Sequence, residues 1–163
     1  MPKIILQEVS AMAPLVERLL ARLRPQLRHL LPTAEIEHIG ATAIPGAITK
    51  GDVDVMVRVT PAEFRAAADV LSAHFAIKQP ENWTPDFASF GDDDSYDLPL
   101  GVQLVAKNTD ADQFSFLRDH FITNPAALAD YNRLKQRHAG DGAEAYWKAK
   151  NALFESILST RER

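Results

Sequence analysis

The chain has 163 residues, 46% hydrophobic and 25% charged, which suits one globular domain and excludes a disordered or low-complexity protein. It contains no cysteine, so disulfides, thiolate metal sites and a cysteine nucleophile are excluded. The net charge of −4 argues against a dedicated nucleic-acid-binding role.

The apolar runs are much shorter than the roughly 18 residues that span a bilayer, and the N-terminus has no signal-peptide plan. We therefore expect a cytoplasmic protein without a membrane segment. We also expect a single domain over residues 1–163.

Residues 10–31 predict a helix, because leucines recur there at spacings of three and four. Ser10 is a suitable N-cap, and Pro14 is tolerated in the first turn. Pro25 lies inside the apolar pattern and is expected to kink or split the helix.

The middle of the chain predicts several strands and one helix. The expected elements are strands at 35–39 and 53–59, a helix at 61–75, and strands at 76–78 and 100–106. Residues 79–98 mix aromatic side chains with prolines and acids, and we expect a long loop or a ragged hairpin there.

The C-terminal part predicts three helices, over 111–122, 124–137 and 142–159. Together these elements indicate an α/β (α+β) domain with a small mixed sheet, flanking helices and a C-terminal helical layer at 111–160.

Asp52 and Asp54 carry the most informative chemistry. Residues two apart on a strand face the same side, so their carboxylates are expected side by side, with Val53 and Val55 in the core. Neighbouring unpaired carboxylates repel unless a cation neutralises them, and hard oxygen ligands suit Mg²⁺ or Mn²⁺. The pair predicts a metal site with a catalytic role in a phosphoryl-type displacement; the alternative is two exposed acids at a strand end.

A turn precedes this strand. Gly40 allows close backbone approach, the free amides of Gly40 and Ala41 suit anionic oxygens, and Thr42 adds a hydroxyl. We expect these three residues to cradle phosphates beside the aspartate pair, which is the combination that nucleotidyl transfer needs.

The segment from Ile36 to Gly46, IEHIGATAIPG, resembles the signature of the GrpB family, which belongs to the polymerase-β-like nucleotidyltransferase superfamily. The C-terminal part is similar to the family as well, at Phe116–Phe121, Asn124-Pro125, Tyr131, Lys135, Tyr146 and Lys150. The resemblance implies a nucleotidyltransferase-like fold and a nucleoside triphosphate bound with Mg²⁺. It also implies transfer of a nucleotidyl group to a hydroxyl acceptor.

Two positions depart from the superfamily pattern. Ala41 replaces the usual serine of the turn, and Gln103 stands where a third carboxylate is expected. A neutral amide cannot act as a general base. A substitute acid could come from the loop that carries Asp92, Asp93, Asp94 and Asp97, although solvated acids are the simpler interpretation.

A bound triphosphate needs positive charge, for which the candidates are Lys50, Arg118, Lys135 and Lys150. Arg118 could instead pair with a nearby acid, and Lys150 could lie on a solvated face. His38 is expected to brace the turn rather than to shuttle a proton. The other aromatic candidates, Trp83, Trp147, Tyr146 and Phe154, are expected in the core, with base stacking as the alternative.

Three functional hypotheses follow. The first is a transferase that binds a nucleoside triphosphate with Mg²⁺. The second is a degenerate, non-catalytic module that binds a nucleotide or a phosphorylated metabolite, which Gln103 and Ala41 favour. The third is a metal-dependent phosphohydrolase.

Overall fold

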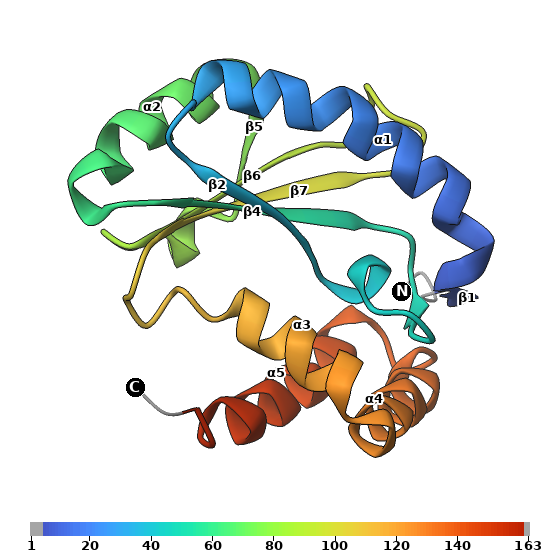
Figure 1. Ribbon diagram of the computed structural model, residues 1–163. Coiled ribbons are helices and arrows are strands. Elements are labelled where there is room, and N and C mark those ends of the chain that lie inside the picture. The colour runs from blue at the N-terminus through green and yellow to red at the C-terminus, as the bar shows by residue number, and fades with distance from the viewer. Residues whose placement is uncertain (1–4, 162–163) are drawn as a thin grey trace.

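A computed structural model describes residues 5–161, and a five-stranded mixed sheet lies at its centre (Figure 1). In spatial order the strands are β2 (Glu35–Ile39), β4 (Val53–Val59), β7 (Leu100–Ala106), β6 (Phe87–Asp92) and β5 (Ala76–Lys78). Strands β4 and β7 are parallel, and the other neighbouring pairs are antiparallel. Helices cover both faces of this sheet, so the predicted mixed α/β architecture is confirmed.

Alternate side chains of strand β4 point to opposite faces of the sheet, as the sequence predicted. Its four valines are buried in the main hydrophobic core, which also contains the apolar faces of α1 (Val9–Leu30) and α2 (Phe64–His74). Asp54 and Met56 alternate with these valines. Met56 belongs to a separate apolar cluster that includes Phe114 at the start of the C-terminal helices. Period-two alternation therefore directs Asp54 toward the C-terminal layer.

Helix α1 differs from its prediction in two respects. It begins at Val9, with Glu8 at the N-cap and no side-chain cap, so Ser10 lies inside the helix. The helix also continues past Pro25 instead of splitting there. Leu23 and Leu27 on either side of this proline are fully buried, so packing against the sheet offsets the backbone hydrogen bond that proline cannot make.

The segment 79–98 is more ordered than a loop. Strand β6 lies inside it and pairs with both β5 and β7, so the hairpin alternative is correct and the long loop is wrong. The central residues of β6, Ala88 to Gly91, are all buried. Because both faces of this strand are covered, it lacks the alternation by which strands are recognised in a sequence.

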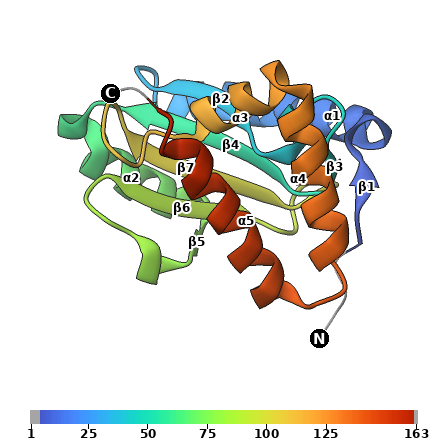
Figure 2. The same cartoon turned by 90° about the horizontal axis from the view of Figure 1, so that it is seen from below.

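Three helices form the C-terminal layer, as predicted: α3 (Phe114–Thr123), α4 (Pro125–His138) and α5 (Ala143–Leu158) (Figure 2). Two short strands that we did not predict, β1 (Gln7–Glu8) and β3 (Ile48–Thr49), pair beside the sheet. Among residues 5–161, no helix combines the length and the apolar character that a bilayer crossing requires.

Candidate functional site

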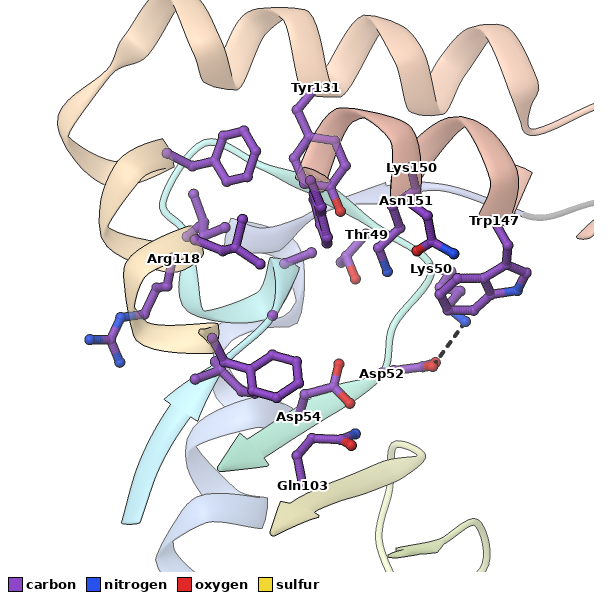
Figure 3. A pocket seen from close by; sticks show the side chains of 18 of the residues that line it. Thr49, Lys50, Asp52, Asp54, Gln103, Arg118, Tyr131, Trp147, Lys150 and Asn151 are labelled. Atoms are coloured by element: carbon purple, nitrogen blue, oxygen red, sulfur yellow. Dashed lines mark ion pairs between the residues drawn. The ribbon is translucent and has the colours of Figure 1, made fainter. Parts of the chain in front are cut away.

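A cavity of about 300 Å³ opens between the sheet and the C-terminal layer (Figure 3). The turn after β2, the start of β4, strand β7 and all three C-terminal helices contribute to its wall. The candidate residues that line it are Gly40, Ala41, Lys50, Asp52, Asp54, Gln103, Arg118, Lys135 and Lys150. Gly40 and Lys150, which are 110 positions apart in the chain, thus share one cavity.

Thr42 is the candidate that lies outside this wall. It is buried in the short helix η1 (Ala41–Ala43), and its hydroxyl is 2.8 Å from Nε2 of His38. Burial, together with the charges of Arg24 and Arg118, lowers the pKa of His38 to about 4, so its imidazole is neutral at physiological pH. The pair therefore braces the turn from behind, in agreement with the interpretation of His38 as a bracing residue.

Two glycines frame the carboxylate of Asp54. Gly40 has φ +75°, and a Cβ atom built on it would lie 2.8 Å from Asp54 Oδ2. Gly101 is opposite Asp54 in the parallel pair β4–β7, and its Cβ would lie 2.4 Å from Oδ1. A methyl group at either position would have to displace the Asp54 carboxylate, so the two glycines leave the space that the carboxylate occupies.

The electrostatic environment of Asp54 disfavours its charged form. Desolvation raises the pKa of Asp54, and the negative charge of Asp52 raises it further. The charges of Lys150 and Lys50 and a hydrogen bond from Gln103 act in the opposite direction, but they do not offset the burial. An additional cation would consequently stabilise the ionised form of Asp54.

Asp52 lies just before β4 at the more open side of the cavity. Its Oδ2 is 3.2 Å from the ammonium nitrogen of Lys50, as the dashed line in Figure 3 shows. The same nitrogen lies 4.6 Å from the centre of the Trp147 ring. Trp147 is 39% exposed, so its expected place in the core is wrong.

The other aromatic candidates do pack as expected. Tyr146 is buried, and Trp83 and Phe154 each pack against one of the hydrophobic clusters. Trp147 alone among the four combines a place in the cavity wall with high exposure.

Two lysines from the C-terminal layer reach the cavity. Burial lowers the pKa of Lys150 to about 8, although the negative charges of Asp54 and Asp52 act to raise it. Lys135 is 1% exposed and donates a hydrogen bond to the carbonyl oxygen of Ile48, and burial lowers its pKa to about 7. Lys135 therefore anchors strand β3 to α4 while it closes the inner end of the cavity.

Arg118 contributes its stem and not its charge. Its guanidinium donates to the carboxylate of Glu37 at 3.1 Å, to that of Asp119 at 2.9 Å and to the carbonyl of His38 at 3.1 Å. Figure 3 shows the head of this side chain directed away from the aspartate pair. Its positive charge is used to join α3 to β2.

Gln103 is placed beside Asp54, but the acidic loop supplies no substitute acid. Asp92 accepts hydrogen bonds from the backbone of Asp94 and Ser95, and Asp93 pairs with Lys78. The carboxylates in the cavity wall are thus those of Asp52 and Asp54. Within residues 5–161, no group of three or more histidine or acidic side chains could hold a metal ion.

The donor set nevertheless fits Mg²⁺ in its usual protein environment. Mg²⁺ is commonly held by one or two carboxylates, and water and phosphate oxygens complete its octahedron. Asp52 and Asp54 are such a pair, and a bound cation would offset the burial that raises the pKa of Asp54. This fit requires a phosphate-bearing ligand, because the protein itself provides so few oxygen ligands.

Sequence reasoning missed the cavity residues Thr49 and Asn151, and also Gly101, which lies against the Asp54 carboxylate. Gly101 did carry a signal, since an isolated glycine inside a strand often marks a close approach of another group. Thr49 and Asn151 carried none, because their positions depend on how β3 and α5 pack.

Comparisons with known proteins agree with this architecture. The family model described as "GrpB protein" matches residues 7–160. UPF0157 protein VC_A0354 of Vibrio cholerae is 34% identical over 143 residues, which are 87% of this chain and 75% of that protein. The crystal structure of the conserved protein GrpB from Enterococcus faecalis superimposes with a TM-score of 0.71 and 17% identity, over 95% of this chain and 98% of that one. The Cid1 poly(U) polymerase superimposes less closely, with a TM-score of 0.44 and 14% identity over 69% of this chain and 38% of that one.

Proposed function

The chain belongs to the GrpB family, and we propose that this member binds a nucleoside triphosphate together with Mg²⁺ in the cavity between β4 and the C-terminal helices. The observation that carries the proposal is the position of the Asp54 carboxylate, which lies against the glycine turn and shares the cavity with Asp52, Lys50 and Lys150. Acids that would hold a cation and bases that would hold phosphate thus line one cavity.

Each group has a role in this proposal. Asp52 and Asp54 would hold Mg²⁺, which would neutralise charge on the phosphates. The backbone amides of the turn at Gly40 and Ala41 would donate hydrogen bonds to phosphate oxygens. Lys50 and Lys150 would donate to the remaining oxygens, with charge-assisted hydrogen bonds.

Arg118, Lys135 and Thr42 make no phosphate contacts in this proposal. Arg118 and Lys135 already donate to protein oxygens, and Thr42 is buried behind the turn. We assign all three to positioning: Thr42 supports the turn, Lys135 supports β3, and Arg118 supports the contact between α3 and β2.

Nucleotidyl transfer is the reaction that this binding mode supports. A hydroxyl oxygen of the acceptor would form a bond to the α-phosphorus, the bond to pyrophosphate would break, and the hydroxyl proton would pass to a water molecule. Lys50 and Lys150 would stabilise the negative charge that develops on the phosphates. Gln103 holds Asp54 by a hydrogen bond but cannot take the proton.

Gln103 favours a second candidate, a non-catalytic module that binds the same nucleotide. The amide stands beside Asp54 where a third carboxylate would complete the metal site, and the acidic loop is engaged elsewhere. Such a module would keep the phosphate contacts and release no pyrophosphate.

Thermal unfolding with ATP, CTP, GTP and UTP, each with and without Mg²⁺, tests the proposal. A ligand that binds the folded state raises the unfolding temperature, so we expect a rise that needs both nucleotide and Mg²⁺. Asp54→Asn should abolish the Mg²⁺-dependent part of the rise. Stabilisation by nucleotide that is indifferent to Mg²⁺ and to Asp54→Asn would favour the second candidate, and no stabilisation would refute both.

Catalysis is tested separately by pyrophosphate release in the presence of hydroxyl acceptors. Pyrophosphate without orthophosphate indicates transfer. Orthophosphate without an acceptor indicates hydrolysis, which is the third hypothesis from the sequence.

A further inference from the structure

Trp147 presents an indole ring at the rim of the cavity. Trp147 is the third residue before Lys150 and the seventh before Phe154, so the three side chains follow one face of α5 and line the same wall. At 39% exposure the ring is more open than an apolar side chain needs to be in a helix that packs against two others.

Two ammonium groups lie over this ring. The nitrogen of Lys150 is 4.3 Å from the ring centre, and that of Lys50 is 4.6 Å away, both within the range of cation–π attraction. Lys50 also pairs with Asp52 at 3.2 Å, so one side chain connects the aspartate site to the ring. A phosphate bound by Lys50 would therefore lie close to the aromatic ring of Trp147.

Charge-assisted hydrogen bonds to phosphate oxygens are stronger than cation–π contacts at a partly exposed site. When phosphates bind, both lysines would move toward them and uncover the indole face. A planar group attached to those phosphates could then cover the exposed ring.

We infer that the base of the bound nucleotide stacks on the indole ring of Trp147. This stacking follows the movement of Lys50 and Lys150 from the ring to the phosphates. This inference rests on the proposed function, because it needs a phosphate-bearing ligand at the aspartate site. Stacking accepts every base, since each has a π-face. The ligand class is therefore a nucleoside triphosphate with weak discrimination among the four bases.

The two tryptophans of the chain make a direct test possible. Trp83 does not line the cavity; it packs on Phe90 with ring centres 5.1 Å apart and donates to the carbonyl of Lys78. Trp83→Phe leaves Trp147 as the sole tryptophan. Its emission is followed, with excitation at the red edge of the band, while Mg²⁺-ATP or Mg²⁺-tripolyphosphate is added. Trp147→Phe is the reciprocal variant, in which only Trp83 reports.

We expect ATP to quench Trp147 and tripolyphosphate to leave it less affected, because only ATP brings a base. Trp147→Ala should weaken ATP binding by roughly 10- to 100-fold, which is the loss measured when a base-stacking aromatic is truncated. Trp147→Phe should bind within a few-fold of wild type, since it keeps an aromatic face. Thermal unfolding of each variant without ligand checks that the fold is intact.

Three outcomes would overturn the inference. Equal quenching by ATP and tripolyphosphate would show that lysine movement alone changes the emission. Undiminished ATP affinity in Trp147→Ala, with Mg²⁺-dependent stabilisation still present, would refute stacking on Trp147 but leave the proposed function standing. Failure of both ligands to bind wild type would refute the proposed function together with the inference.

Discussion

Gly101 and Asp54 face each other across the parallel strands β7 and β4, and a methyl group on Gly101 would lie 2.4 Å from the Asp54 carboxylate. Gly101→Ala should therefore displace Asp54 and abolish most Mg²⁺-dependent nucleotide stabilisation. The clash should also reduce the free energy of unfolding by about 1–3 kcal/mol, the usual result of overpacking. Both effects are measured by thermal unfolding with and without Mg²⁺-ATP.

Gly140 offers a matched control for this substitution. A Cβ atom there would meet nothing within 4 Å, and its φ is not in the left-handed region. Gly140→Ala should leave both stability and ligand response close to wild type. A Gly101→Ala protein with the same ligand response as Gly140→Ala would show that Asp54 needs no such space.

Asp54 should reduce stability at neutral pH in the absence of ligand. Folding raises its pKa through burial, so the folded state favours the protonated carboxyl, and stability is lost as pH rises from the ordinary aspartate value through the raised one. Asp54→Asn should then be more stable than wild type at neutral pH by about 0.5–2 kcal/mol, as is common when a functional group is neutralised. The gain should disappear below about pH 4, where aspartate is protonated in both states.

Asp52→Asn is the natural comparison for that variant. Asp52 is 36% exposed and paired with Lys50, so its substitution should change the unfolding free energy by less than about 1 kcal/mol. Denaturant titrations over a pH series would measure both variants. A wild-type protein that is more stable than Asp54→Asn at neutral pH without ligand would contradict the expectation.

Lys135 should leave a signature at alkaline pH. Its pKa of about 7 in the folded state is below the ordinary lysine value of 10.5, so the unfolded chain binds more protons between these limits. Wild-type stability should thus rise with pH across this window relative to Lys135→Met, with a slope that approaches at most about 1.4 kcal/mol per pH unit. Below pH 7 the difference between the two proteins should level off.

Subtracting Lys135→Met from wild type cancels the titrating groups that do not interact with Lys135; Lys150 is not one of them, because its charge also lowers the pKa of Lys135. A difference that is constant from pH 7 to pH 10 would mean that Lys135 keeps an ordinary pKa in the folded protein, and that its contact with Ile48 is that of a fully charged ammonium.

Substitutions of Arg118 and Lys150 should have different effects, because the charge of Arg118 stabilises the fold whereas that of Lys150 would bind the ligand. Arg118→Met removes the hydrogen bonds to Glu37 and to the carbonyl of His38, so we expect a loss of about 1–2 kcal/mol in stability and unchanged affinity for Mg²⁺-ATP. Lys150→Met removes a charge that points into the cavity, so affinity should fall roughly 10- to 100-fold, as for the loss of a charged hydrogen bond. Calorimetric titration measures the affinities, and the reverse ranking of the two variants would refute our assignment of Arg118.

Local patterns in the sequence predicted much of the fold. The valines of 53–59 predicted a strand with one apolar face, and this strand is β4. The same pattern separated Asp54 from the core, because side chains alternate on any strand whatever its neighbours are. The spacing of leucines likewise predicted α1, although the effect of Pro25 depended on packing that the pattern does not contain.

Other features could not be read from local patterns. Strand β6 has no alternation, because both of its faces are covered. Trp147 was expected in the core since large aromatic residues usually lie there, yet it is exposed in the cavity wall while its chain neighbour Tyr146 is buried, a difference that depends on how α5 packs. Thr42 belongs to the turn but faces His38, which the sequence did not distinguish from facing a ligand.

The sequence by itself determined most of the residues that form strands and helices, and that two aspartates follow a glycine turn, since these depend on spacing along one segment of the chain. The tertiary structure alone decided which charges enter the cavity. Arg118 and Lys150 were equivalent candidates in the sequence, but the packing of α3 on β2 gives Arg118 protein partners, whereas α5 directs Lys150 toward Asp54. Which charged side chain lies in the cavity therefore depends on contacts between segments that are distant in the sequence, and no single segment specifies those contacts.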